Sequence, residues 1–216
     1  YREVHQKAAV LYRKQARFQL ITTGKISQKC LLFENQHIER LRKASRYFAF
    51  PFDAENLKQK IEEECQACDA NQDYRLRISL DKSGEIELSR QVLTPLSPSF
   101  CQAKLYLQET NLQQAFTYFK TTYRPHLNLG KQEIIYHNKS GELLETSIGN
   151  LVLKIAGKLY TPPIELGILP GIYRQHLLET GQVEEKVLTL ADLAQAEAIY
   201  GCNAVRGLYE LSLEEN

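Results

Sequence analysis

Apolar side chains follow two different periods in the first half of the chain. Residues 74–80 alternate between polar and apolar, and after a turn at 82–85 the alternation resumes at Ile86 and Leu88. A period of two places every second side chain on the same face of a strand, so this stretch predicts a hairpin with one buried face. Over residues 35–48 the apolar positions fall three or four apart instead, which predicts an amphipathic helix.

The other elements expected before residue 110 are shorter or less regular. Two short strands are predicted at 18–23 and 29–33, on either side of Gly24, and a second helix is predicted at 54–67. Residues 1–16 have the pattern of an amphipathic helix, which we interpret as an entry helix or the end of a linker.

After Arg124 the chain changes to short apolar runs separated by turns, a pattern that is typical of strands. Helices are expected to begin near Gly171 and Leu190. The expected strands are 133–137, 143–146, 151–155, 158–161, 183–188, 198–202 and 207–211.

Prolines at 95 and 98, followed by the polar segment 108–114, indicate a connection between two domains. We therefore expect an α+β protein with an N-terminal α+β domain over 1–110 and a C-terminal α/β domain over 118–216. A chain of 216 residues and 24.9 kDa is long enough for one or two domains of roughly 100 to 200 residues each.

Charge and hydropathy exclude several classes of partner. The formal net charge is +1, from 27 basic and 26 acidic residues, which gives no electrostatic reason to expect nucleic acid or an anionic membrane. No run approaches the roughly 20 apolar residues of a membrane helix, and no signal-peptide pattern is present near the start. We expect small-molecule chemistry in the cytoplasm. Because methionine is absent, even at position 1, we expect this chain to be a portion of a longer polypeptide.

The five cysteines do not form a disulfide scaffold or a zinc motif. They stand at 30, 65, 68, 101 and 202, and Cys65 and Cys68 form one CxxC in a segment rich in Glu and Lys. No second pair stands at zinc-finger spacing. We therefore interpret both cysteines as ordinary helix residues in a reducing compartment, and we expect no metal site.

Four segments of the second half supply complementary chemical groups. They are an amine at Lys120, a carboxylate at Glu145, a helix start at Pro170 and Gly171, and an amide at Asn203. A primary amine condenses with an aldehyde, a carboxylate keeps a pyridine nitrogen protonated, and the N–H groups of a helix start bind phosphate. Together these groups suit a phosphorylated aromatic aldehyde, and the cofactor we predict is pyridoxal 5′-phosphate.

Each candidate also has an ordinary structural interpretation. Taken alone, Lys120 is typical of a solvated surface charge, and Glu145 is typical of an exposed residue after a hairpin. Arg40 shares a helical face with His37 and Leu41, which turns its guanidinium toward the packed side and calls for an anionic partner. On local grounds that partner is equally a phosphate or an acidic side chain.

Read together, these segments resemble the class IV fold-type of pyridoxal-phosphate enzymes, which includes branched-chain and D-amino acid aminotransferases and 4-amino-4-deoxychorismate lyase. The motifs occur in the family's order and spacing between about residues 18 and 211. They are Ile-Thr-Thr (21–23), His-Ile-Glu-Arg-Leu (37–41), Lys-Thr-Thr-Tyr-Arg (120–124), Glu-Thr-Ser-Ile-Gly-Asn-Leu (145–151), Tyr-Thr-Pro-Pro (160–163), Gly-Ile-Leu-Pro-Gly-Ile-Tyr-Arg (167–174) and Cys-Asn-Ala-Val-Arg-Gly (202–207). The resemblance implies a two-domain fold with the cofactor cleft between the domains, and a homodimer.

The resemblance also implies the roles of single residues. Lys120 is the Schiff-base lysine, Glu145 is the partner of the pyridine nitrogen, and Thr23 assists proton transfer. Arg124 or Arg206 is our candidate for binding a substrate carboxylate. The implied phosphate ligands are Arg40, the backbone of Ile172 and Tyr173, and Asn203.

Within the family, the chain resembles most the lyase domains joined to an aminodeoxychorismate synthase component. The expected reaction is therefore the conversion of 4-amino-4-deoxychorismate to 4-aminobenzoate and pyruvate, a step of folate synthesis. Aminotransferases of the class carry a tyrosine five residues after the lysine, where this chain has Pro125. An aminotransferase is the second interpretation, and a non-catalytic domain that partners a synthase is the third.

Overall fold

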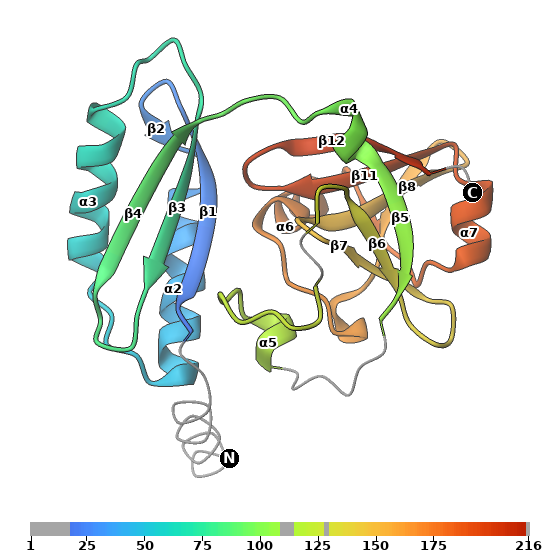
Figure 1. Ribbon diagram of the computed structural model, residues 1–216, viewed down its shortest axis with the longest axis horizontal. Coiled ribbons are helices and arrows are strands. Elements are labelled where there is room, and N and C mark those ends of the chain that lie inside the picture. The colour runs from blue at the N-terminus through green and yellow to red at the C-terminus, as the bar shows by residue number, and fades with distance from the viewer. Residues whose placement is uncertain (1–17, 109–114, 128–129, 215–216) are drawn as a thin grey trace. The chain divides into compact units, whose positions relative to one another are not determined.

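The computed structural model describes residues 18–108, 115–127 and 130–214 (Figure 1). The amphipathic helix expected over 1–16 lies outside these residues. By its contacts the chain divides into two compact units. Unit 1 contains the described residues up to Leu93 together with Phe119–Arg124, and unit 2 contains the rest. Within the described ranges, none of the helices has both the length and the apolar character needed to cross a membrane.

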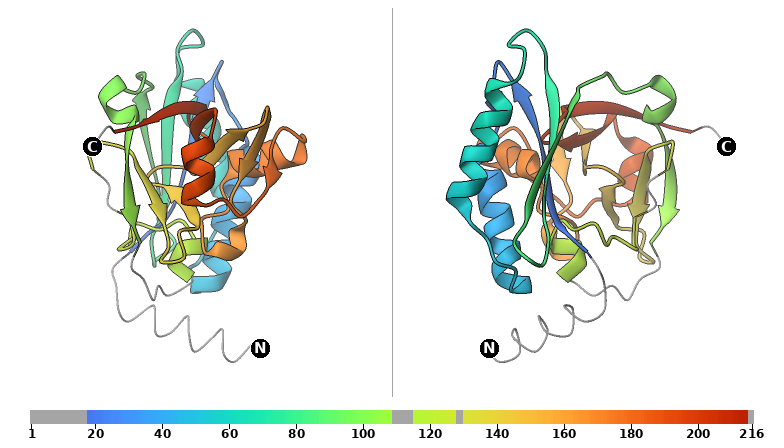
Figure 2. Two further views of the ribbon diagram at one scale, coloured as in Figure 1. Left: turned by 90° about the vertical axis from the view of Figure 1, so that its right-hand side faces the viewer. Right: turned by 60° about the vertical axis from the view of Figure 1, so that its left-hand side comes forward.

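Unit 1 is a four-stranded antiparallel sheet with two helices against it. The strands are ordered β2-β1-β3-β4. Figure 1 and Figure 2 show both helices on the same face of this sheet. The elements are β1 (Leu20–Ser27), β2 (Cys30–Leu31), α2 (Glu34–Phe48), α3 (Ala54–Gln66), β3 (Tyr74–Leu80) and β4 (Ile86–Val92).

The core of unit 1 lies between the helices and the sheet, as the two periods predict. Leu76 and Leu80 of β3 are fully buried, and so are Leu41 of α2 and Leu57 and Ile61 of α3. Burying apolar side chains of this size contributes about 1.5 to 3 kcal/mol each relative to exposure. The predictions of a hairpin with one buried face and of two helices are therefore confirmed.

The expected break at Gly24 is wrong, because β1 continues through this residue to Ser27. A Cβ at Gly24 would stand 2.5 Å from Nε2 of His37, so the glycine allows α2 to approach the strand. The chain turns instead at Gln28 and Lys29, which have positive φ angles of 49° and 63°. In this strand the glycine marks a close approach rather than a turn.

Unit 2 is built around one large sheet. The described strands are ordered β10-β9-β8-β11-β12-β5-β6-β7. Because β7 also pairs with β8, the strands from β8 through β11, β12, β5 and β6 to β7 close into a ring. The strands are β5 (Gln102–Leu107), β6 (Ile134–His137), β7 (Leu143–Thr146), β8 (Asn150–Ile155), β9 (Lys158–Thr161), β10 (Glu184–Glu185), β11 (Ala198–Asn203) and β12 (Gly207–Leu213).

The helices of unit 2 are short, and strands of the ring supply much of its apolar core. Buried apolar residues of neighbouring strands meet there, among them Ile135, Leu143, Leu151 and Leu153. The helical segments are α4 (Pro98–Cys101), α5 (Ala115–Tyr118), η1 (Ile164–Leu166), α6 (Ile172–Glu179) and α7 (Leu190–Gln195). The helices expected near Gly171 and Leu190 are confirmed.

Two features of unit 2 differ from the sequence pattern. Strand β5 was not expected, because all but one of its residues are exposed and no alternation marks it. The strand expected at 183–188 is reduced to β10, since Val183 and Leu188 are buried but the residues between them are exposed.

The boundaries between the two units differ from the expected domain limits of 1–110 and 118–216. Strand β5 belongs to the sheet of unit 2. Phe119–Arg124 belongs to unit 1, because the Ile21 N–H donates to the Lys120 carbonyl and the Thr122 N–H donates to the Gln19 carbonyl, both at 2.9 Å. A further bridge pairs Leu20 with Thr121. This short segment extends the pairing of β1.

Candidate active site

The candidate residues fall into two groups, one in each unit. Unit 1 holds Thr23, Arg40, Lys120 and Arg124, and unit 2 holds Glu145, Ile172, Tyr173, Asn203 and Arg206. Lys120 was expected in the C-terminal domain, whereas its contacts place it in unit 1.

Lys120 is held by backbone pairing to β1, and its side chain is half-buried. The positive charge of Lys120 influences the pKa of the His37 imidazole, which is fully buried on α2. Burial, followed by the charges of Arg40 and Lys120, lowers the pKa of His37 to about 3. The imidazole is therefore neutral at physiological pH and adds no charge to the two cations beside it.

Arg40 lies one turn after His37 on α2 and is half-buried. Its pKa is lowered to about 10, first by burial and then by the nearby charge of Arg124. In unit 1, the charges of Arg40 and Lys120 therefore act on His37, and the charge of Arg124 acts on Arg40. Two guanidinium groups and an ammonium group in such surroundings favour an anionic ligand.

Alternation along β1 separates its two threonines. Thr22 faces α2, where its hydroxyl lies 2.6 Å from Nδ1 of His37. Thr23 therefore points to the opposite face of the sheet, and only 8% of its surface is exposed. The role of Thr23 in proton transfer, which the resemblance implies, stays a prediction.

In unit 2, Glu145 stands near the end of β7 and is 3% exposed. The Leu169 N–H donates to its Oε2 at 3.4 Å. The ordinary interpretation of Glu145 as an exposed residue after a hairpin is wrong, because the strand turns the side chain inward. A buried carboxylate calls for a protonated or cationic partner.

The start of α6 lies close to the same region of unit 2. Asn150 donates from Nδ2 to the Leu169 carbonyl at 2.8 Å, which fixes the chain just before the helix. A Cβ at Gly171 would overlap Oδ1 of Asn150, so glycine is required at the N-cap. Among the residues that the structure describes, no side chain caps this helix, and the N–H groups of its first turn, from Ile172, are those that suit a phosphate.

Asn203 and Arg206 are engaged with neighbouring backbone. Oδ1 of Asn203 accepts from the N–H groups of Val205 and Arg206, and its Nδ2 donates to the Ile148 carbonyl at 3.3 Å. Arg206 donates to the Thr94 carbonyl, and burial lowers its pKa. The proposed roles of both residues toward phosphate and substrate stay predictions.

Sequence reasoning missed Glu133, Ser147 and Tyr209. Glu133 is fully buried and accepts hydrogen bonds from both hydroxyls. Glu133 precedes a short strand and stands 76 positions before Tyr209, so no local pattern indicates the contact. Only the pairing of distant strands brings these residues together.

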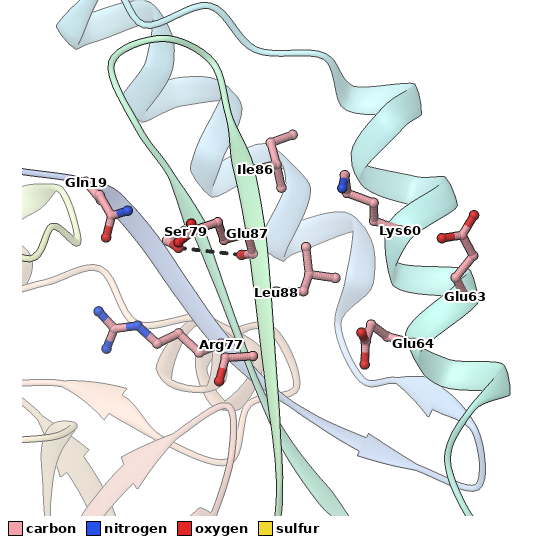
Figure 3. Close-up of a pocket in the computed structure, with 10 residues that line it drawn as sticks. Gln19, Lys60, Glu63, Glu64, Arg77, Ser79, Ile86, Glu87 and Leu88 are labelled. Carbon is pink, nitrogen blue, oxygen red and sulfur yellow. Dashed lines mark hydrogen bonds between the residues drawn. The ribbon is translucent and has the colours of Figure 1, made fainter.

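Outside these groups, unit 1 has an open pocket of about 660 Å³ beside α3 and the β3–β4 hairpin (Figure 3). Lys60, Glu64 and Arg77 are among its lining residues, so both charge signs are present. None of the candidate residues lines this pocket. We therefore do not assign the chemistry to it.

The CxxC cysteines are buried at the end of α3. Cys65 is in the last turn and Cys68 follows the helix. Burial raises the pKa of the Cys65 thiol to about 11, which keeps it protonated. In the described part of the chain, no group of three His, Cys, Asp or Glu residues is arranged to hold a metal ion.

Each unit carries groups of the kinds that pyridoxal 5′-phosphate requires. Glu145 is a buried carboxylate of the kind that pairs with a pyridinium nitrogen. In unit 2, the N–H groups of the first turn of α6 suit a phosphate. In unit 1, the guanidinium of Arg40 is a suitable phosphate donor and Lys120 supplies a primary amine.

The model of the amino-transferase class IV family matches residues 19–212. Two curated proteins are similar over most of the chain. Aminodeoxychorismate lyase of Saccharomyces cerevisiae is 23% identical, over 84% of this chain and 67% of the lyase. A Thermotoga maritima protein named probable branched-chain-amino-acid aminotransferase is 26% identical, over 83% of this chain and 73% of that protein.

The fold is also that of a solved aminotransferase structure. A hypothetical aminotransferase from Mycobacterium tuberculosis, in its PLP-bound form, matches with a TM-score of 0.75 at 18% identity. The match covers 91% of this chain and 81% of that chain. The expected fold class is thereby confirmed.

Proposed function

We propose, because the chain belongs to the class IV aminotransferase family, that it is a pyridoxal-phosphate-dependent lyase acting on 4-amino-4-deoxychorismate. The products are 4-aminobenzoate and pyruvate, in folate synthesis. The observation that carries the proposal is the buried carboxylate of Glu145, which lies in the same unit as the start of α6, where no described side chain forms a cap. A pyridinium and a phosphate on one small cofactor match these two groups.

The binding roles follow from the charges of the two groups. Arg40, the N–H groups of Ile172 and Tyr173, and Asn203 hold the phosphate, and Glu145 keeps a proton on the ring nitrogen. Arg124 or Arg206 binds a carboxylate of the substrate. When bound, the cofactor supplies an aldehyde that captures the substrate amine and a ring that accepts an electron pair.

In the reaction, Lys120 removes the proton from the ring carbon that carries the substrate amine. The bond from the substrate ring to the enolpyruvyl oxygen then breaks, and Thr23 or Lys120 donates a proton to that oxygen. The ring becomes aromatic, which makes the elimination effectively one-way. The protein has mainly to position the substrate and to move these protons.

Two residues favour a lyase over an aminotransferase. Thr23 is buried on the face of β1 that points away from α2, and it matches a threonine of the lyases. Pro125 stands where aminotransferases of the class carry a tyrosine. An aminotransferase remains the second candidate, supported by the similarity to the Thermotoga maritima protein.

Covalent attachment is tested by reconstituting the protein with pyridoxal 5′-phosphate and reducing it with borohydride. We expect a visible absorption band that borohydride removes, and a single modified peptide that contains Lys120. The Lys120→Ala variant should lose the band and the modification, whereas Lys58→Ala, on the exposed surface of α3, should keep both. A modified peptide elsewhere, or a band that persists in Lys120→Ala, would refute the assignment.

Product analysis separates the two enzyme classes. Incubation with aminodeoxychorismate should release equal amounts of 4-aminobenzoate and pyruvate without a keto acid. Incubation with a branched-chain or D-amino acid and 2-oxoglutarate should yield no glutamate. Glutamate formation without 4-aminobenzoate would instead identify an aminotransferase.

We also propose a cytoplasmic homodimer that works with an aminodeoxychorismate synthase, as a separate partner or as part of one polypeptide. Light scattering of the purified protein should give a mass twice that of the 24.9 kDa chain. If the protein binds no cofactor but binds the synthase, the third interpretation of a non-catalytic domain replaces the lyase.

A further inference from the structure

The turn of residues 146–149 connects the candidate groups of unit 2. Glu145 precedes this turn, and Asn150, which follows it, donates to the Leu169 carbonyl before α6. Asn203 donates to the Ile148 carbonyl within the turn. The position of the turn therefore sets the separation between the Glu145 carboxylate and the start of α6.

The buried carboxylate of Glu133, which directly precedes β6, is hydrogen-bonded to this turn. The Ser147 hydroxyl donates to Oε1 of Glu133, and the Tyr209 hydroxyl donates to its Oε2 at 2.9 Å. The Ser147 N–H also donates to the Ile134 carbonyl at 3.0 Å. We call Glu133, Ser147 and Tyr209 the Glu133 clamp.

The absence of a side chain at Gly201 makes room for the ring of Tyr209. Tyr209 of β12 pairs with Gly201 of β11, and a Cβ at Gly201 would overlap the phenol ring. Any larger residue at this position would push the ring away from Glu133. This space gives the Tyr209 hydroxyl a fixed direction toward the carboxylate.

Both carboxylate oxygens of Glu133 have hydrogen-bond donors within the clamp. Glu133 is 0% exposed, and each of its oxygens accepts a hydrogen bond from a hydroxyl. Burial, followed by the charge of Glu133, raises the pKa of Tyr209, so the phenol stays protonated and remains a donor. Removing one donor would leave a buried carboxylate partly unsatisfied.

We propose that the Glu133 clamp positions Glu145 against the ring nitrogen of the cofactor by fixing the turn of residues 146–149. The clamp residues act through the turn and are positioning residues rather than catalytic ones. This inference rests on the proposed function, because it concerns the same cofactor.

The test compares the binding of pyridoxal 5′-phosphate with that of an analogue whose ring nitrogen is replaced by carbon. The wild-type protein should bind the natural cofactor more tightly, and Glu145→Gln should abolish this preference. Tyr209→Phe and Ser147→Ala should each reduce the preference about tenfold, which corresponds to about 1.4 kcal/mol. Their affinity for the analogue should change less than about twofold.

Tyr200→Phe is the matched control, because it removes the same hydroxyl from the neighbouring strand β11 and Tyr200 makes no hydrogen bond through that hydroxyl with a described residue. It should keep the full preference. Equal loss of affinity for both ligands in the clamp variants would indicate general damage and overturn the proposal. If Tyr209→Phe does not fold, Ser147→Ala decides the outcome.

Failure of the clamp is distinguishable from failure of the proposed function. If the wild-type protein prefers the natural cofactor and both clamp variants keep this preference, only the clamp is refuted. If the wild-type protein binds neither ligand, the proposed function itself is refuted and the clamp with it.

Discussion

At the scale of single residues, burial decides the chemistry more than residue type does. Lys120 and Glu145 have ordinary surface interpretations in the sequence, and the structure removes that interpretation for Glu145, which is 3% exposed. His37 is a related case, because a histidine at the surface would titrate near physiological pH. Buried beside Arg40 and Lys120, it has a pKa of about 3 and stays neutral.

The pKa of His37 predicts how stability depends on pH. Its folded pKa of about 3 lies below the ordinary histidine pKa of 6.5, so the unfolded chain binds more protons between these values. Stability from this residue is fully present above about pH 6.5 and is lost as the pH falls toward 3. Between pH 7 and 5 the wild-type protein should lose about 2 kcal/mol more unfolding free energy than His37→Gln.

Denaturant unfolding at both pH values measures this difference, and NMR of the imidazole supplies a direct check. The ring signals of His37 should not shift between pH 5 and 8. Equal pH dependence of the two proteins, together with a titrating ring, would contradict the prediction.

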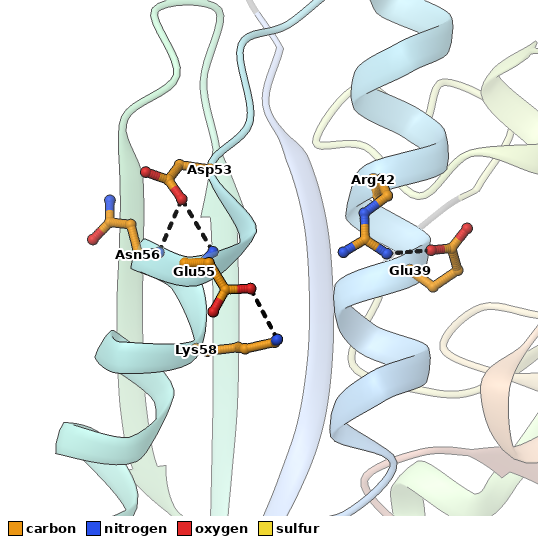
Figure 4. A network of polar contacts seen from close by, with 6 residues as sticks. All are labelled: Glu39, Arg42, Asp53, Glu55, Asn56 and Lys58. Atoms are coloured by element: carbon orange, nitrogen blue, oxygen red, sulfur yellow. Dashed lines mark hydrogen bonds and ion pairs between the residues drawn. The ribbon is translucent and has the colours of Figure 1, made fainter.

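At the scale of elements, local signals at the ends of helices and turns account for much of the fold. Asp53 is the N-cap of α3, and its Oδ1 accepts from the N–H groups of Glu55 and Asn56, both at 3.0 Å (Figure 4). Thr189 and Asp192 form a capping box at the start of α7. Such caps can be read from sequence because donor and acceptor are two or three residues apart.

The cap of α3 gives a prediction with two matched controls. Asp53→Ala should lower the free energy of unfolding by about 1 kcal/mol, whereas Asp53→Asn, which keeps an acceptor oxygen, should stay close to wild type. Lys58→Ala removes only an exposed ion pair with Glu55 and should cost less than about 1 kcal/mol. Chemical denaturation measures all three, and an equal loss in Asp53→Asn would show that the cap is not the cause.

At the scale of the whole molecule, the division into units does not follow the order of the chain. Phe119–Arg124 is flanked on both sides by residues of unit 2, yet it pairs with β1 of unit 1. The candidate lysine is thus held by a different unit from the candidate carboxylate. The local stability of the lysine segment should follow that of unit 1.

Hydrogen exchange tests this assignment. Leu57→Ala empties a fully buried position of unit 1 and should cost about 2 to 5 kcal/mol there. It should speed exchange in β1 and in Phe119–Arg124, while β11 changes little. Leu151→Ala, at a fully buried position of unit 2, should have the opposite effect. Equal acceleration of all these segments in both variants would show a single cooperative unit instead.

The sequence by itself determined the hairpin β3–β4, the helices α2 and α3, and most strands of unit 2. The pattern of apolar and polar residues that predicts each of these elements lies in consecutive residues. It also indicated the family, through motifs of consecutive residues. Only the tertiary structure decided that β1 runs through Gly24, that Lys120 pairs with β1, and that the buried Glu133 accepts a hydrogen bond from Tyr209. These features depend on contacts between residues far apart in the chain, such as Gln19 and Thr122, which are separated by 103 positions, and no local pattern encodes such pairings.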